Sequence, residues 1–127
     1  MIPKRLAWLP VLAVSLLAAT GCERTPTVSY STDVVPILDK YCKSCHMPGQ
    51  AGYVVSGFEL ESYESLMDGT QFGPVVLPGD PLTSVLVMLI EGRVDPALRM
   101  PHGDAMKPTD QEILTIRRWV EQGAKNN

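Results

Sequence analysis

Two cysteines and a histidine stand close together in the run Cys42-Lys43-Ser44-Cys45-His46. In this spacing each thiol can add to one vinyl group of a haem, and the adjacent imidazole can coordinate the iron from the proximal side. A chain that carries such a group must build its core around it. The motif therefore predicts one covalently attached haem c, with Cys42 and Cys45 as thioether donors and His46 as an iron ligand.

A Cys-x-x-Cys pair also occurs in redox disulfides and in zinc sites. A structural zinc ion takes four ligands, and beyond the motif the chain offers only Cys22 and His102. A thioredoxin-like redox pair belongs beside a βαβ pattern, which this sequence lacks. Haem is therefore favoured, and zinc or thiol chemistry remains the alternative.

The N-terminus has the pattern of an export signal. Lys4 and Arg5 form a short positive region, an apolar stretch covers residues 6–17, and small residues occupy 18–21. The apolar stretch is too short to span a membrane comfortably. Residues 1–21 are therefore predicted to be a signal peptide, and haem attachment outside the cytoplasm is consistent with this prediction.

The end of this signal, Ala19-Thr20-Gly21-Cys22, resembles a bacterial lipobox, in which the cysteine is diacylated and becomes the first mature residue. One departure is Ala19, since leucine is usual at that position. We expect Cys22 to carry lipid, because an acylated cysteine is an anchor whereas a lone exposed thiol is reactive. The alternative is an ordinary secretory signal that leaves Cys22 as a free or intermolecular thiol.

Lipidation would hold the protein in the bacterial cell envelope, facing the periplasm or the cell surface. An aspartate after the lipidated cysteine would suggest inner-membrane retention in enteric bacteria, but Glu23 stands there. The outer membrane is therefore preferred. Residues 22–29 are predicted to be the lipidated N-terminus and a tether, because they are polar and lack periodicity. Residues 30–127 are predicted to form one domain, since about a hundred residues suffice for one modest core.

Loss of Lys4 and Arg5 with the signal leaves nine Lys and Arg against fourteen Asp and Glu, so the net charge of the mature chain is −5. An acidic surface argues against nucleic acid or anionic lipid as a partner. It suits redox-partner proteins that present a basic docking surface.

Helical periodicity predicts an all-α domain with four helices. The first follows a cap at Ser31 or Thr32 and leads into Cys42, with Pro36 in its first turn. A loop covers Met47 to Gly57. The second helix is short; Ser62 caps it and Gly69 ends it. The apolar positions expected in the first helix are Val34, Leu38 and Tyr41.

The third and fourth helices have stronger start signals. Asp80-Pro81 predicts a helix that runs to about Glu91 and stops at Gly92. A capping box that begins at Thr109 predicts the last helix, which ends at Gly123. The stripe expected to be buried on the third helix comprises Leu82, Val85, Leu86, Leu89 and Ile90; on the last it comprises Ile113, Ile116 and Val120.

The order of these parts resembles the small class I cytochromes c. More narrowly, the segments 34–38, 78–84 and 117–124 resemble planctomycete-type cytochrome c domains, and the resemblance spans roughly residues 30–124. It implies a helical domain packed around one covalent haem. It also implies that the first and last helices pack together, with Val34, Leu38 and Tyr41 against Ile116, Trp119 and Val120.

The resemblance also indicates the distal iron ligand, because class I cytochromes carry a methionine where Met100-Pro101 stands. A thioether is a soft ligand that favours ferrous iron. Methionine is also a common core gap-filler, which is the expectation for Met67 and Met88. His102, Met106 and an open site remain alternatives to Met100.

If both axial positions are filled, the iron has no free position for a substrate. The predicted function is then electron transfer rather than catalysis: a membrane-tethered carrier that shuttles freely or accepts electrons as a subunit of a dehydrogenase. The alternatives are a peroxidase-like haem enzyme and a gas-sensing haem module, and both need an open or displaceable distal site. Arg117 and Arg118 are expected to be surface charges rather than partners of a haem propionate.

Overall fold

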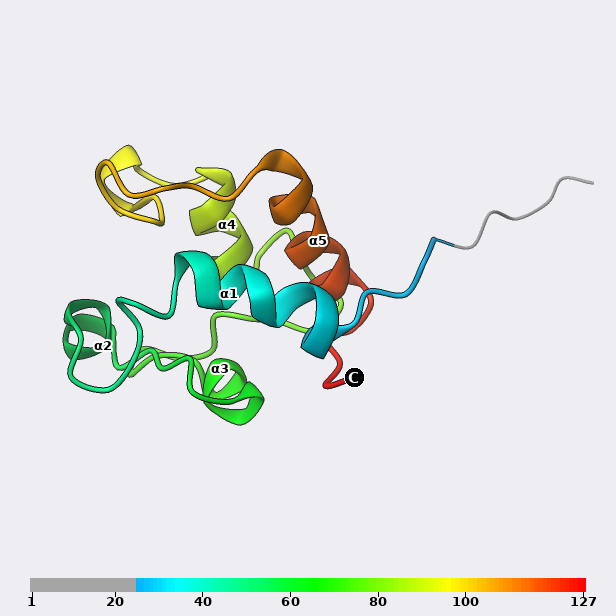
Figure 1. The fold of residues 1–127 in the computed structure, drawn as a ribbon, viewed down its shortest axis with the longest axis horizontal. Helices are drawn as coiled ribbons and strands as arrows, with labels where there is room; N and C mark the ends of the chain where they lie inside the picture. Colours follow the sequence, from blue (N-terminus) through cyan, green and yellow to red (C-terminus); the bar gives the residue numbers. More distant parts are fainter. Residues whose placement is uncertain (1–24) are drawn as a thin grey trace, which may run out of the picture.

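Five α-helices make up most of the regular structure in the computed structural model, which describes residues 25–127 (Figure 1). A π-helical turn, η1, precedes them, and a 3-10 turn, η2, lies between the fourth and fifth. The elements are η1 (Tyr30–Val34), α1 (Val35–Tyr41), α2 (Ala51–Ser56), α3 (Tyr63–Asp68), α4 (Val85–Glu91), η2 (Pro96–Leu98) and α5 (Asp110–Glu121).

The described residues contain no β-strand, and an isolated bridge between Thr70 and Gly73 is their only recorded β-pairing. The prediction of an all-α domain is therefore confirmed for this part of the chain. None of the helices in residues 25–127 has the length and apolar character needed to cross a bilayer. The predicted signal peptide and Cys22 lie outside the described residues.

The first helical segment begins earlier than predicted. Ser29 is the N-cap, and its side chain accepts a hydrogen bond from the backbone N–H of Thr32 at 3.3 Å. The prediction of a cap at Ser31 or Thr32 is wrong, because the chain is already helical at Tyr30. Pro36 lies in the first turn of α1, as expected.

The predicted loop over residues 47–57 contains the short helix α2 in its second half. This part of the loop prediction is wrong. Gly57 ends the helix with φ of 71°, a left-handed conformation that glycine adopts without strain. The backbone N–H of Tyr53 in this helix donates to the carbonyl of Cys45 at 3.2 Å. Helix α2 is therefore supported by the cysteine motif, a tertiary contact that its glycine-rich sequence does not reveal.

The capping signals of α3 and α5 are confirmed. Ser62 and Ser65 form a reciprocal capping box at α3, and Gly69 ends that helix. Thr109 and Glu112 form the capping box of α5. Each box satisfies backbone donors that the first turn of a helix leaves free.

Helix α4 begins at Val85, four residues later than the predicted start at Pro81. The carboxylate of Asp80 caps a turn instead, since its Oδ1 accepts the backbone N–H groups of Leu82 and Thr83 at 3.0 and 3.1 Å. The hydroxyl of Ser84 then donates to the carbonyl of Asp80 at 2.7 Å, which keeps this buried side chain hydrogen-bonded.

This later start changes the buried face of α4. Leu82 lies outside the helix and is 61% exposed, so its predicted place in the core is wrong. Val85 is also exposed. The side chains that α4 buries are Leu86, Val87 and Ile90.

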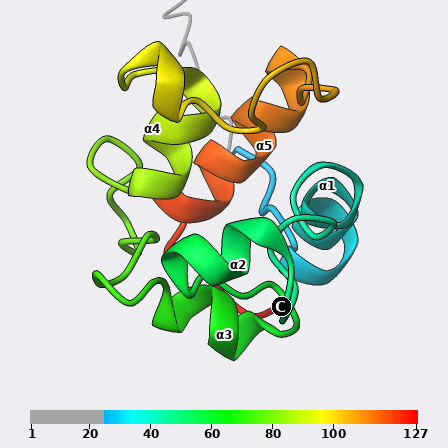
Figure 2. The ribbon, with the colours of Figure 1, turned by 90° about the vertical axis from the view of Figure 1, so that its left-hand side faces the viewer.

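The core lies among η1, α1, α3, α4 and α5 (Figure 2). Its largest fully buried side chain is Trp119 on α5. The ring of Tyr30 lies 5.4 Å from the ring of Trp119 and 5.1 Å from that of Tyr63, centroid to centroid. All six residues expected to join the first and last helices are buried in this one cluster: Val34, Leu38, Tyr41, Ile116, Trp119 and Val120.

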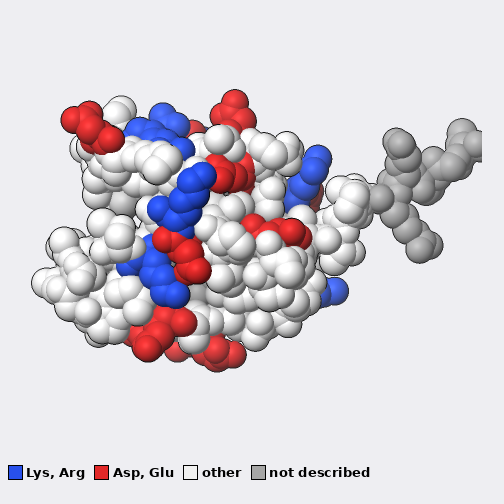
Figure 3. All heavy atoms as spheres, viewed as in Figure 1, with Lys and Arg blue, Asp and Glu red and all other residues white. Residues whose placement is uncertain are grey.

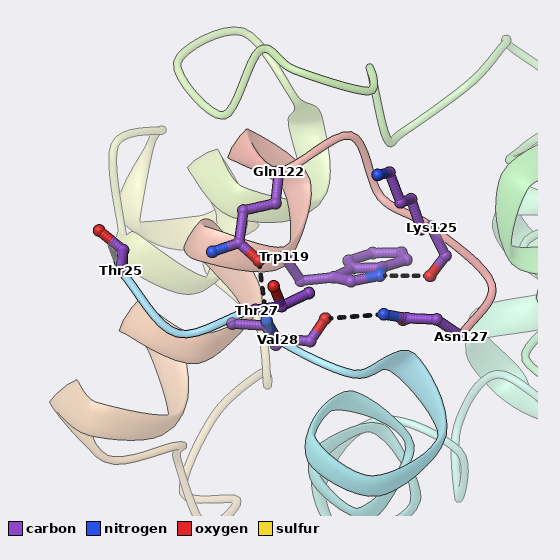
Figure 4. A pocket seen from close by; sticks show the side chains of 7 residues that line it. All are labelled: Thr25, Thr27, Val28, Trp119, Gln122, Lys125 and Asn127. Atoms are coloured by element: carbon purple, nitrogen blue, oxygen red, sulfur yellow. Dashed lines mark hydrogen bonds between the residues drawn. The ribbon is translucent and has the colours of Figure 1, made fainter. Parts of the chain in front are cut away.

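The segment before η1 is attached to the C-terminal end of the chain (Figure 4). The backbone N–H of Val28 donates to Gln122 Oε1 at 2.8 Å, and Gln122 Nε2 donates to the carbonyl of Pro26 at 3.0 Å. Asn127 Oδ1 accepts the N–H of Tyr30 at 2.8 Å. Contacts of the folded domain therefore reach back into the predicted tether, as far as Pro26.

Candidate haem site

The cysteine motif follows directly from α1. Cys42 is the C-cap of that helix, and its backbone N–H donates to the carbonyl of Leu38 at 2.9 Å. The N–H groups of Cys45 and His46 both donate to the carbonyl of Cys42, at 3.1 and 3.2 Å. These turns place both thiols and the imidazole at the end of α1, on a framework that the core holds through Leu38.

Both cysteines of the motif have free thiols. Cys42 is half-buried, whereas Cys45 is exposed. Burial first, and the electrostatic effect of the neighbouring Cys45 next, raise the pKa of the Cys42 thiol to about 11. Reactive cysteines of redox disulfides have lowered pKa values, because the thiolate is the nucleophile. The environment of Cys42 therefore disfavours the thiol-exchange alternative.

The imidazole of His46 is half-buried, and its Nδ1 atom is buried without a hydrogen-bond partner. Burial lowers the pKa of His46; the backbone of Phe58 opposes this effect, and the charge of His102 adds to it. Because the lowered pKa keeps the ring neutral, His46 is in the form that coordinates metals.

Sequence reasoning missed two residues at this ring. Phe58 contacts the imidazole edge-on, with the ring centroids 5.1 Å apart. Gly52 on α2 lies so close that an added Cβ would be 2.7 Å from His46 Cε1. The sequence held no signal for Gly52, because residues 47–57 were predicted to form a loop, where a glycine is unremarkable.

Met100 is half-buried, and its backbone N–H donates to the carbonyl of Leu89 at 3.2 Å, near the end of α4. The two alternative distal ligands, His102 and Met106, are exposed. The assignment of Met100 as distal ligand stays a prediction.

The residues at this site fit a haem. Two free thiols and a neutral imidazole are the donor set that covalent attachment and iron ligation require. The segments that follow the motif and flank Met100 also expose large apolar side chains. These side chains are Val54, Val55, Leu98 and Met106. Among residues 25–127 no three His, Cys, Asp or Glu side chains gather as a metal cluster, as the zinc alternative would need.

Arg117 is held by an acidic side chain rather than left free for a haem propionate. Its Nη1 lies 2.8 Å from Glu91 Oε1, and the same carboxylate pairs with Arg93. Both side chains of this ion pair are partly buried, so Arg117 is not the solvated surface charge that the sequence predicted.

An all-α domain with a Cys-x-x-Cys-His motif at the end of its first helix has the features of a c-type cytochrome domain. Residues 42–104 match the family model described as Planctomycete cytochrome C. The matched stretch contains Cys42, Cys45, His46 and Met100, and it supports a cytochrome c-like domain. It does not reach the segments 34–38 and 117–124, on which the resemblance also rested. No curated protein and no solved structure matches the chain.

Proposed function

We propose that this protein is a membrane-tethered, monohaem c-type cytochrome that carries single electrons between redox partners in the bacterial envelope. The observation that carries this proposal is the contiguous Cys42, Cys45 and His46 motif, held at the end of α1 in a segment that matches a cytochrome c family model. The haem would supply an iron that gains and loses one electron.

The chain's own residues account for attachment and ligation. Cys42 and Cys45 each provide one sulfur for a thioether bond. His46 stays neutral because it is buried, and it offers one ring nitrogen to the iron. Met100 offers a soft thioether from a separate segment, which would favour the ferrous state and leave no position for a substrate.

Tethering is proposed through a lipid on Cys22. Support comes from the lipobox-like sequence, in which small residues precede Cys22 and a polar segment follows it. Mass spectrometry should find an acylated Cys22 at the mature N-terminus, and Cys22→Ser should move the protein to the soluble fraction. An unmodified cysteine, or cleavage at another position, would refute the anchor.

The proposed partners are redox proteins with a basic docking surface, because the mature chain has a net charge of −5. On the face seen in Figure 3, acidic and basic side chains lie next to one another. Attraction between this protein and a basic partner is therefore expected to come from the net charge of the protein rather than from a single acidic patch on this face. Electron-transfer rates with a basic partner should fall as salt is raised, and a rate independent of salt would contradict this proposal.

A spectroscopic redox titration of the purified protein tests the carrier function. We expect a low-spin haem that is reduced and reoxidised reversibly by one electron. A high-spin haem that binds carbon monoxide or peroxide readily would instead favour the sensor or the peroxidase-like enzyme.

A further inference from the structure

Helix α2 packs directly onto the proximal histidine through a residue that has no side chain. An ideal Cβ built on Gly52 would lie 2.7 Å from His46 Cε1, 2.9 Å from His46 Nδ1 and 2.8 Å from the carbonyl oxygen of Cys45. Real Cβ atoms almost never approach other atoms this closely. Two of these atoms belong to the imidazole ring and the third to the backbone of the haem motif.

The backbone conformation of Gly52 does not itself require glycine. Its φ lies outside the left-handed region, unlike that of Gly49, whose φ is +83°. In an ordinary helix, alanine at such a position is more stable than glycine. Glycine is a poor helix former, so helix stability does not explain its presence at residue 52. The steric contact that a Cβ would make with His46 and Cys45 does explain it.

The ring that Gly52 contacts is restrained elsewhere as well. Phe58 packs edge-on against it, and the backbone N–H of Leu60 donates to the carbonyl of His46 at 2.9 Å. Tyr53, the neighbour of Gly52, is bonded to the carbonyl of Cys45. The imidazole consequently has little freedom to move away from a side chain introduced at residue 52.

We propose that Gly52 is a positioning residue for the proximal ligand: close contact with its bare Cα fixes where the His46 imidazole stands relative to the two attachment cysteines. This inference rests on the proposed haem site. Gly52 does not touch the reacting group and acts only through His46. Its replacement should disturb axial ligation while leaving both thioether bonds in place.

The test compares holo-protein carrying Gly52→Ala with wild type and with Gly49→Ala. Each variant adds one methyl group, but a Cβ at Gly49 would meet nothing within 4 Å. Gly49→Ala should lower thermal stability through strain in the left-handed region and leave the haem spectrum unchanged. Gly52→Ala should keep covalent haem but gain high-spin absorption and show a shifted midpoint potential.

A second variant is included in case Gly52→Ala does not acquire haem. The double variant Gly52→Ala, Phe58→Leu gives the ring room to shift and should recover part of the low-spin spectrum or of the haem yield. A wild-type spectrum and potential in Gly52→Ala would overturn the inference. The inference would also be overturned if Gly52→Ala is defective and the double variant recovers neither the low-spin spectrum nor the haem yield. Wild-type protein without covalent haem would refute the proposed function instead, which is a separate result.

Discussion

The hydroxyl of Tyr41 donates a 2.8 Å hydrogen bond to Glu112 Oε2, which joins the residue before the haem motif to the first turn of α5. The same carboxylate accepts the backbone N–H of Thr109 at 2.8 Å, and its other oxygen lies 3.2 Å from Lys40 Nζ. Glu112 is therefore both the capping residue of α5 and a link to α1.

These bonds give a pH-dependent stability. The Thr109 N–H first, and the Tyr41 hydroxyl next, lower the pKa of Glu112 from 4.5 to about 2. A carboxyl whose pKa is lower in the folded than in the unfolded chain stabilises the fold at pH values above the unfolded pKa. This contribution is lost as the pH falls from about 4.5 to about 2. Glu112→Gln should lower the melting temperature at pH 7 and flatten its decline over this acid range. A parallel decline in wild type and variant would contradict the assignment.

The distal ligand can be tested by its spectrum. Met100→Ala should remove the weak sulfur-to-iron absorption at the red end of the oxidised spectrum and lower the potential, because a soft ligand is lost. His102→Ala and Met106→Ala are the matched controls and should keep the band. If the band survives in Met100→Ala and disappears in Met106→Ala, the ligand is Met106.

The buried face can be tested with two identical substitutions. Leu66 is fully buried, so Leu66→Ala should cost about 2–5 kcal/mol of unfolding free energy. Leu82 is 61% exposed, so Leu82→Ala should change the unfolding free energy by about 0.5 kcal/mol or less. Urea unfolding of both variants gives the comparison. Equal costs would show that Leu82 belongs to the core, as its sequence pattern suggested.

The attachment of the segment before η1 can be tested by amide hydrogen exchange. Gln122→Ala removes the acceptor of the Val28 N–H, and a net contribution of about 1 kcal/mol per hydrogen bond predicts several-fold faster exchange there. Lys125→Ala is the control, because only its backbone carbonyl is bonded, to Trp119 Nε1. Unchanged exchange at Val28 in the Gln122 variant would show that this contact does not hold the segment.

Elements with local signals could be predicted from the sequence. Ser62 and Thr109 act through bonds to residues three positions away, so the cap at Ser62 and the capping box at Thr109 could be predicted from the chain itself. Helix α2 could not, because its support is the carbonyl of Cys45, a tertiary partner. The start of α4 was misplaced because the Asp80 carboxylate can cap a turn as well as a helix.

The residues of the candidate site likewise fall into those that the sequence predicted and those that only the fold brings together. Cys42, Cys45 and His46 are contiguous, so their chemistry could be inferred without a fold. The contribution of Gly52 depends on where α2 packs, and that of Phe58 depends on a ring contact. No spacing in the sequence encodes either relationship. The distal ligand stays a prediction, because three candidates lie on one segment after α4.

The intact mass of the protein, purified after export from a host that matures haem c, tests the central claim most directly. The account predicts the mass of the mature, acylated polypeptide plus one haem; acid-acetone extraction should leave the haem mass in place, and a Cys42→Ala, Cys45→Ala variant should lack it. A mass equal to the polypeptide without haem, or haem that acid-acetone removes, would contradict it.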